Sequence, residues 1–151
     1  MRFFLAVIAA LLTACGPAPE PVKPAIPNPA DEPWYTDTVE QLASLNQEAE
    51  DLFGRKKFDQ ASAVITKAQP LANRLLSVPR TTLAAMEAVS DLDDLYGRML
   101  LANGHYGWAR LFFQKNVARW RNWQPQTEES GRRRKLAESR VAECDRRLAE
   151  K

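Results

Sequence analysis

This 151-residue sequence contains no recognisable combination of a nucleophile and a base that would indicate a catalytic site. His105 is the only histidine, which removes most histidine-based catalysis and histidine-rich metal sites. It falls in a predicted turn, where a solvent-exposed role is favoured over that of a general base. No Gly-x-Ser-x-Gly, phosphate-binding glycine loop or His-Glu-x-x-His motif occurs. We therefore expect a protein that is not an enzyme and that has no cofactor.

Carboxylates cluster at Asp91, Asp93 and Asp94. Two carboxylates on one helical turn could hold a hard cation, but Ca²⁺ takes about six to eight oxygen ligands. No loop of alternating oxygen ligands accompanies these residues. We therefore predict no metal site. The carboxylates are expected either to form a solvated face or to interact favourably with the helix dipole near a helix N-terminus.

The sequence contains two cysteines, Cys15 and Cys144, and no Cys-x-x-Cys pair. Ala137, Val141, Cys144 and Leu148 recur at helical spacing, which predicts that Cys144 is buried and inert. The alternative is a thiol that reacts or pairs between molecules.

Cations and aromatic residues alternate in residues 119–123, and a basic run follows at 132–135. Such clusters can bind nucleic acid or anionic lipid headgroups. However, Trp120 falls on a predicted core stripe, neighbouring glutamates dilute the basic run, and the formal net charge is only +2. We therefore expect a packed Trp120 within an ordinary charged surface and no nucleic-acid binding. Trp123 is expected to be partly exposed at an interface.

The apolar run from Phe3 to Leu12 is too short to span a bilayer, which needs about 20 residues, but suits a signal peptide. It ends at Leu12-Thr13-Ala14-Cys15, which resembles the bacterial lipobox. That resemblance implies that residues 1–14 are a signal peptide removed before Cys15, and that Cys15 becomes the diacylated first residue. An ordinary secretory signal or a signal anchor is the alternative.

A lipidated Cys15 would attach the chain to a membrane, because two acyl chains anchor stably where one binds only marginally. Gly16 follows it, and in the enteric sorting rule the absence of Asp at this position favours the outer membrane. We therefore expect a lipid-anchored protein of the cell envelope, on the outer membrane and facing the periplasm.

Proline-rich sequence follows the lipobox, with seven prolines in residues 16–33. This composition opposes regular helix and favours an extended chain, which at about 3.1 Å per residue could reach roughly 50 Å. Residues 15–33 are therefore interpreted as the lipidated cysteine and a tether, with a proline-rich docking ligand as the alternative. The remaining residues, 34–151, suffice for one small domain.

Helical periodicity in residues 34–151 predicts an all-α domain of about five helices, because no alternating strand pattern occurs. Asp37 and Glu40 are expected to form a capping box for the first helix. Pro70 is expected to kink or interrupt the second. The first expected helix ends near Gly54, and the second runs from residue 58 to before Pro79. The third and fourth span residues 81–102 and 106–123, and the fifth follows Thr127. Apolar positions expected to face inward include Leu83 on the third helix and Leu136, Val141, Cys144 and Leu148 on the fifth.

Two of the predicted helix pairs share a pattern of small and aromatic residues. The corresponding positions are Ala49 and Gly97, Phe58 and Tyr106, Ala61 and Ala109, and Ile65 and Phe113. This pattern is similar to the tetratricopeptide repeat, in which small residues let paired helices approach and aromatic residues fill the gap between them. The units lie 48 residues apart, from Phe58 to Tyr106, compared with about 34 in the family. The family closes each unit with a small residue, which Ala68 matches and Asn116 does not.

The repeat resemblance implies antiparallel helical hairpins, a fifth helix that caps the stack, and a ligand on the concave side formed by the first helices. A generic helical bundle is the alternative. On the repeat interpretation, the candidates for partner binding are Asn46, Gln47, Glu50, Asp94, Arg98 and Leu101, with Trp123 as a separate interface candidate.

The mixed polarity of these candidates suits a peptide or protein segment better than a small apolar ligand. We therefore expect an adaptor or assembly scaffold that binds another envelope protein. The competing hypotheses are a carrier of a small molecule or lipid, held in a pocket between hairpins, and an enzyme.

Overall fold

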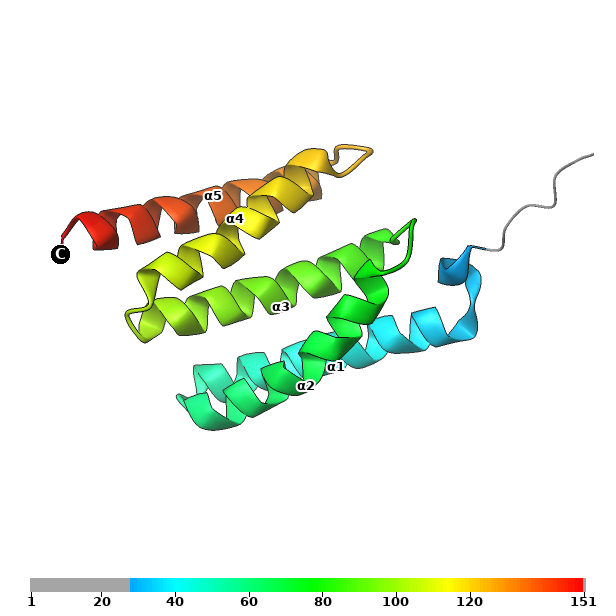
Figure 1. Cartoon of the computed structure of the whole chain (residues 1–151), viewed down its shortest axis with the longest axis horizontal. Helices are drawn as coiled ribbons and strands as arrows, with labels where there is room; N and C mark the ends of the chain where they lie inside the picture. Colours follow the sequence, from blue (N-terminus) through cyan, green and yellow to red (C-terminus); the bar gives the residue numbers. More distant parts are fainter. Residues whose placement is uncertain (1–27, 151) are drawn as a thin grey trace, which may run out of the picture.

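The computed structural model describes residues 28–150, which fold entirely as helices and their connections. The prediction of an all-α domain is confirmed for these residues, whereas the lipobox and Cys15 lie outside them. A short 3₁₀ helix, η1, precedes five α-helices (Figure 1). The elements are η1 (Pro29–Asp31), α1 (Pro33–Gly54), α2 (Phe58–Leu76), α3 (Leu83–Ala102), α4 (Tyr106–Asn122) and α5 (Glu128–Ala149).

The α-helices form two antiparallel hairpins and a final helix. α1 packs on α2, α3 packs on α4, and α5 covers α4 (Figure 1). The larger apolar core joins α1, α2 and α3, whereas a smaller cluster of Ala109, Phe113 and Cys144 joins α4 to α5. The burial predicted for Cys144 is confirmed, and desolvation raises the pKa of its thiol.

The start of α1 differs from the prediction of a capping box at Asp37 and Glu40. The helix begins at Pro33, four residues before Asp37. Proline is tolerated there because it lacks an N–H, and the N–H groups in the first turn of a helix have no partner within the helix. Tyr35 in this first turn is buried, and its hydroxyl oxygen accepts from the Thr82 N–H at 3.1 Å. Burial of this turn against α3 thus extends the helix beyond what the capping signal indicated.

α2 continues through Pro70 without interruption and ends at Leu76, before Pro79. Pro70 lies on the exposed side of the helix, where its ring meets solvent rather than a neighbouring helix. The expectation that Pro70 interrupts α2 is therefore wrong.

Three leucines that were expected to face inward, Leu83, Leu136 and Leu148, are exposed. For α5 the reason is that it packs mainly on α4 and so buries a narrow strip. The residues that α5 buries are Ser130, Ala137 and Cys144. Its start is as predicted, because the Thr127 hydroxyl accepts from the Ser130 N–H at 3.1 Å.

Small residues let the helices of each hairpin approach closely. Ala49, Ala61 and Ala109 are completely buried. Gly97 of α3 faces Phe113 of α4, and a Cβ at Gly97 would lie 2.6 Å from the Phe113 ring. No other side chain fits at position 97 without displacing this ring.

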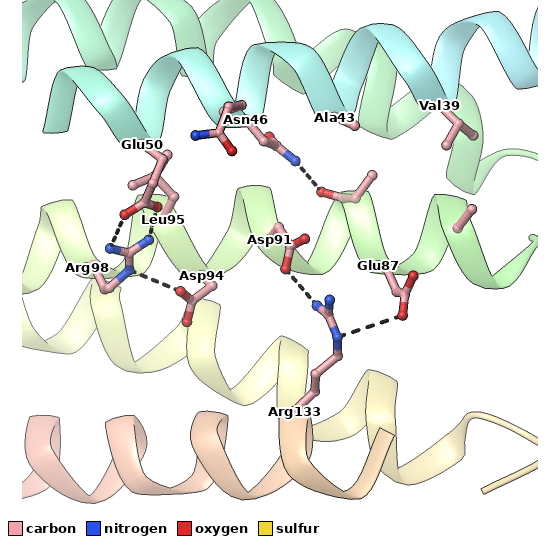
Figure 2. A pocket seen from close by; sticks show the side chains of 13 residues that line it. Val39, Ala43, Asn46, Glu50, Glu87, Asp91, Asp94, Leu95, Arg98 and Arg133 are labelled. Carbon is pink, nitrogen blue, oxygen red and sulfur yellow. Dashed lines mark hydrogen bonds and ion pairs between the residues drawn. The ribbon is translucent and has the colours of Figure 1, made fainter. Parts of the chain in front are cut away.

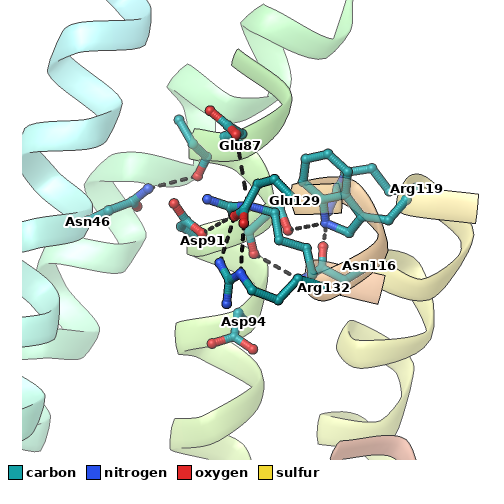
Figure 3. Close-up of polar contacts among 12 residues, drawn as sticks. Asn46, Glu87, Asp91, Asp94, Asn116, Arg119, Glu129 and Arg132 are labelled. Carbon is teal, nitrogen blue, oxygen red and sulfur yellow. Dashed lines mark hydrogen bonds and ion pairs between the residues drawn. The ribbon is translucent and has the colours of Figure 1, made fainter. Parts of the chain in front are cut away.

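A polar network is buried between α3 and α4. Asp93 accepts from Arg119 Nη2 at 2.8 Å and from Lys115 Nζ at 3.1 Å. Asn116 donates to the Ser90 carbonyl at 2.9 Å, and Arg119 also donates to Asn116 (Figure 3). Asp93 therefore belongs to the interior, and the expectation of a solvated face holds only for its neighbour Asp91, whose side chain is half exposed.

Candidate functional site

A groove of about 510 Å³ lies between α1, α3 and α5 (Figure 2). The first, third and fifth α-helices thus line the groove, whereas α2 and α4 contribute no residue to it. The lining residues are Val39, Ala43, Asn46, Gln47 and Glu50 from α1, Ala84, Glu87, Ala88, Asp91, Asp94, Leu95 and Arg98 from α3, and Arg133 from α5.

The structure brings together five of the seven candidate binding residues in this groove. Asn46, Gln47 and Glu50 line it from α1, and Asp94 and Arg98 from α3. Their spacing along each helix places them on one face, and the pairing of α1 with α3 brings the two faces together.

The other two candidates lie elsewhere. Leu101 packs, partly buried, against the small cluster between α4 and α5. Trp123 is half-buried on the side of the molecule away from the groove, where it lines a separate pocket with Leu76 and Met86. Its ring lies edge-on to the buried Trp120, with centroids 6.4 Å apart.

Arg98 joins the two walls of the groove at one end. Its guanidinium donates with two nitrogens to the carboxylate of Glu50 on α1, and with Nε to Asp94 Oδ2 at 3.0 Å (Figure 2). The hydrogen bonds from Arg98 hold the pKa of Glu50 below its ordinary value, against the opposing effect of partial burial. A bidentate pair of this kind fixes the relative position of α1 and α3.

Asp94 lies between two guanidinium groups. Arg140 of α5 approaches with Nε 3.0 Å from Asp94 Oδ1, on the opposite oxygen from Arg98. Burial nevertheless raises the pKa of Asp94, because desolvation of the carboxylate outweighs the attraction of the two cations. Burial likewise lowers the pKa of Arg140.

Arg133 joins α5 to α3 further along the groove. Its Nη1 donates to Asp91 Oδ1 at 2.6 Å, and its Nε donates to Glu129 Oε1 at 2.7 Å and lies 3.9 Å from Glu87 Oε1. Arg132 also donates to Glu129 at 2.6 and 2.7 Å (Figure 3), and lowers the pKa of that exposed carboxyl to about 2. Arginine side chains therefore bridge all three helices that form the groove.

Asn46 provides an open acceptor at the floor of the groove. Its Nδ2 donates to the Ala88 carbonyl at 2.7 Å, which fixes the orientation of the carboxamide. Its Oδ1 is buried and has no hydrogen-bond donor among the described residues. A buried acceptor without a partner costs about 1–3 kcal/mol, so a donor supplied by a bound segment would offset this cost.

Three charged residues of the groove, Glu87, Asp91 and Arg133, were not among the binding candidates identified from the sequence. Glu87 and Asp91 follow the spacing of Asp94 and Arg98, at intervals of four, three and four residues, so the stripe on α3 was visible in the sequence. Arg133 gave no such signal, because its position depends on how α5 packs against the preceding helices.

The described residues contain no group of three or more His, Cys, Asp or Glu side chains arranged to hold a metal ion. None of the described helices is both long and apolar enough to cross a membrane. His105 is exposed in the turn between α3 and α4, as expected. The polar chemistry of the groove is therefore that of carboxylates, guanidiniums and the two carboxamides of Asn46 and Gln47.

Acid should weaken the link between α1 and α3. The pKa of folded Glu50 lies below its ordinary value of 4.5, so its stabilising contribution is present above that pH and is lost as pH falls through the lowered pKa. Since Glu50 is half exposed, we expect Glu50→Gln to cost at most about 1 kcal/mol at neutral pH. Chemical denaturation over a pH series should show a shallower loss of stability below pH 4.5 in this variant.

Asp94→Asn is the matched comparison for this pH series. Because the pKa of Asp94 is raised in the folded protein, its protonated form stabilises the fold. This contribution to the free energy of unfolding is lost as the pH rises through the pKa of the folded state. The two substitutions should therefore change the acid limb in opposite directions. Identical pH profiles for both variants would contradict the assigned electrostatics.

Comparisons of the chain with known protein families, with curated proteins and with solved structures find no match.

Proposed function

We propose that this protein is a bacterial lipoprotein, anchored through Cys15, that acts as an adaptor or assembly scaffold for another protein of the cell envelope. In this proposal the groove between α1, α3 and α5 holds an extended segment of the partner. The observation that carries the proposal is the convergence in one groove of five residues chosen from their register in α1 and α3.

The tetratricopeptide-like interpretation is part of the proposal. It is supported by the alternation of groove helices with outer helices, and by the close approach of Gly97 to Phe113. Phe58 departs from it, because this residue is exposed rather than buried between paired helices. The anchor rests on the lipobox and the proline-rich sequence that follows it.

The lining favours a peptide that carries basic side chains. Four carboxylates line the groove, at Glu50, Glu87, Asp91 and Asp94, and they outnumber the two lining guanidiniums together with that of Arg140, which reaches Asp94 from α5. Asn46 adds an acceptor for a main-chain or side-chain N–H. Basic groups of a partner would therefore meet complementary charge. A carrier of lipid or of another apolar small molecule is disfavoured, because its ligand would have to desolvate these carboxylates.

Site-specific photo-crosslinking in intact cells tests this proposal. Ala43 is exposed on the groove wall, whereas Ala142 is exposed on α5 away from the groove, so a crosslinker at each position forms a matched pair. We expect a discrete envelope protein to be captured from position 43 and not from 142. Ala84→Trp, which fills the groove from α3, should abolish its recovery from position 43.

The same cells separate the adaptor role from the anchor. Cys15→Ser should release the protein from the membrane fraction, while the released form still crosslinks to the same protein from position 43. Equal capture from both positions would refute the groove as the binding site. Unchanged membrane attachment of Cys15→Ser would refute lipidation.

A further inference from the structure

Charged residues are divided between the groove helices and the outer helices. No Asp or Glu occurs in residues 60–86 or 95–127, which include nearly all of α2 and the whole of α4. α1 shows the opposite bias, with five carboxylates and no Lys or Arg. The domain therefore has an acidic side at α1 and a basic side at α2 and α4. In Figure 1, α2 passes in front of α1, and α4 passes in front of α5.

The exposed side of α2 and α4 also carries large apolar side chains. Trp108 is 64% exposed, and Leu111 and Leu76 are also exposed. Trp108 borders a pocket floored by Tyr96 and Leu100 of α3. We define the outer face as the exposed side chains of Lys67 and Arg74 on α2 and of Trp108, Leu111, Lys115 and Arg121 on α4.

Several cations of the outer face are not committed to carboxylates. Lys67, Arg74 and Arg121 form no ion pair with any described residue, and Lys115 pairs with Asp93 while its side chain stays 55% exposed. Most guanidiniums on α5, by contrast, lie within 4.0 Å of a carboxylate. The positive potential of the outer face is therefore available to an external anionic surface.

The chain enters the domain beside this face. Trp34, in the first turn of α1, lies under the guanidinium of Arg74, which is 4.1 Å from the ring centroid. Arg74 is itself a residue of the outer face. α1 therefore begins beside Arg74, at the edge of the outer face.

We propose that the outer face docks on an anionic lipid surface. Exposed tryptophan and leucine beside Lys and Arg, on helices that contribute almost no carboxylates of their own, is the side-chain chemistry of proteins that lie at the headgroup region. The proposal rests on the proposed membrane anchor, and it deepens the adaptor function by orienting the domain. With the outer face on lipid, the groove on the opposite helices stays open to a partner.

Vesicle sedimentation tests this proposal without the lipid anchor. The probe is the chain from residue 15 onward with Cys15→Ser, mixed with vesicles of phosphatidylcholine alone or of phosphatidylcholine with phosphatidylglycerol. We expect binding to the anionic vesicles that weakens with added salt. Each cation near an anionic surface strengthens binding about fivefold, so Lys67→Gln with Arg121→Gln should weaken it by more than about tenfold.

Lys135→Gln with Arg146→Gln is the matched control, because both residues are exposed on α5 away from the outer face and the net charge changes equally. This control should leave binding nearly unchanged. Tryptophan emission should shift to the blue on anionic vesicles, and Trp108→Phe should remove most of that shift.

The proposal is overturned if the anionic vesicles do not sediment the chain, or if both double variants weaken binding equally. Sedimentation that is equal on neutral vesicles, or binding to an acidic polypeptide in place of vesicles, also overturns it. None of these outcomes bears on crosslinking from position 43 or on the lipidation of Cys15, so the two proposals fail separately.

Discussion

Asp93→Ala should lower the free energy of unfolding by about 3–5 kcal/mol, because it leaves a buried guanidinium without its counter-ion. The side chain of Arg119 is only 9% exposed and lies 2.8 Å from Asp93. Lys115 also loses its acceptor, although its exposed ammonium can turn to water. Urea denaturation of the purified chain would measure the difference.

Two further variants establish whether this loss comes from the unpaired charge. Asp91→Ala removes a neighbouring carboxylate that is half exposed, and should cost no more than about 1 kcal/mol. Arg119→Met in the Asp93→Ala background removes the stranded cation, so it should restore part of the stability. A loss below about 1 kcal/mol for Asp93→Ala would mean that water reaches Arg119 and that the network is not sealed.

Phe113→Ala should cost about 3–5 kcal/mol, because Phe113 is completely buried where α3, α4 and α5 meet. Gly97→Ala attacks the same contact from the other side. Its new methyl group would overlap the Phe113 ring, and overpacking of this kind costs about 1–3 kcal/mol. This penalty opposes the gain of about 1 kcal/mol that alanine normally gives over glycine inside a helix.

The control for Gly97 is Gly131 of α5, where a Cβ would meet nothing within 4 Å. Gly131→Ala should stabilise the protein by up to about 1 kcal/mol, since only helix propensity changes. Gly97→Ala should become less harmful when Phe113→Leu has removed the ring. If thermal or urea denaturation gives additive losses for Gly97→Ala and Phe113→Leu, the two residues do not share the contact described.

The helices could be predicted from the sequence because their signals are local. Apolar residues recur at helical spacing, and Gly104 and Thr127 mark a helix end and a helix start. The capping box at Asp37 misled because Tyr35 and its contact with Thr82 extend α1 toward its N-terminus. That contact joins residues far apart in the chain, so it left no local signal.

The groove could be predicted in part, because register on α1 and α3 identifies residues that share a face. Arg133 and the interior position of Asp93 could not, since each depends on partners from another helix. Asp91, Asp93 and Asp94 are adjacent and chemically alike, yet successive helical residues point about 100° apart. Only the packing of α4 determines which of them is buried.

The small apolar cluster between α4 and α5 implies that the domain does not open as one unit. α5 buries only three of its residues, and ion pairs from Arg133 and Arg140 to α3 supply its links across the groove. Its amide hydrogens should therefore exchange through partial opening, at a lower free energy than those of α1 to α3. Any segment held in the groove would then be thermodynamically coupled to closure of the last helix, and its affinity would include the free energy of that closure.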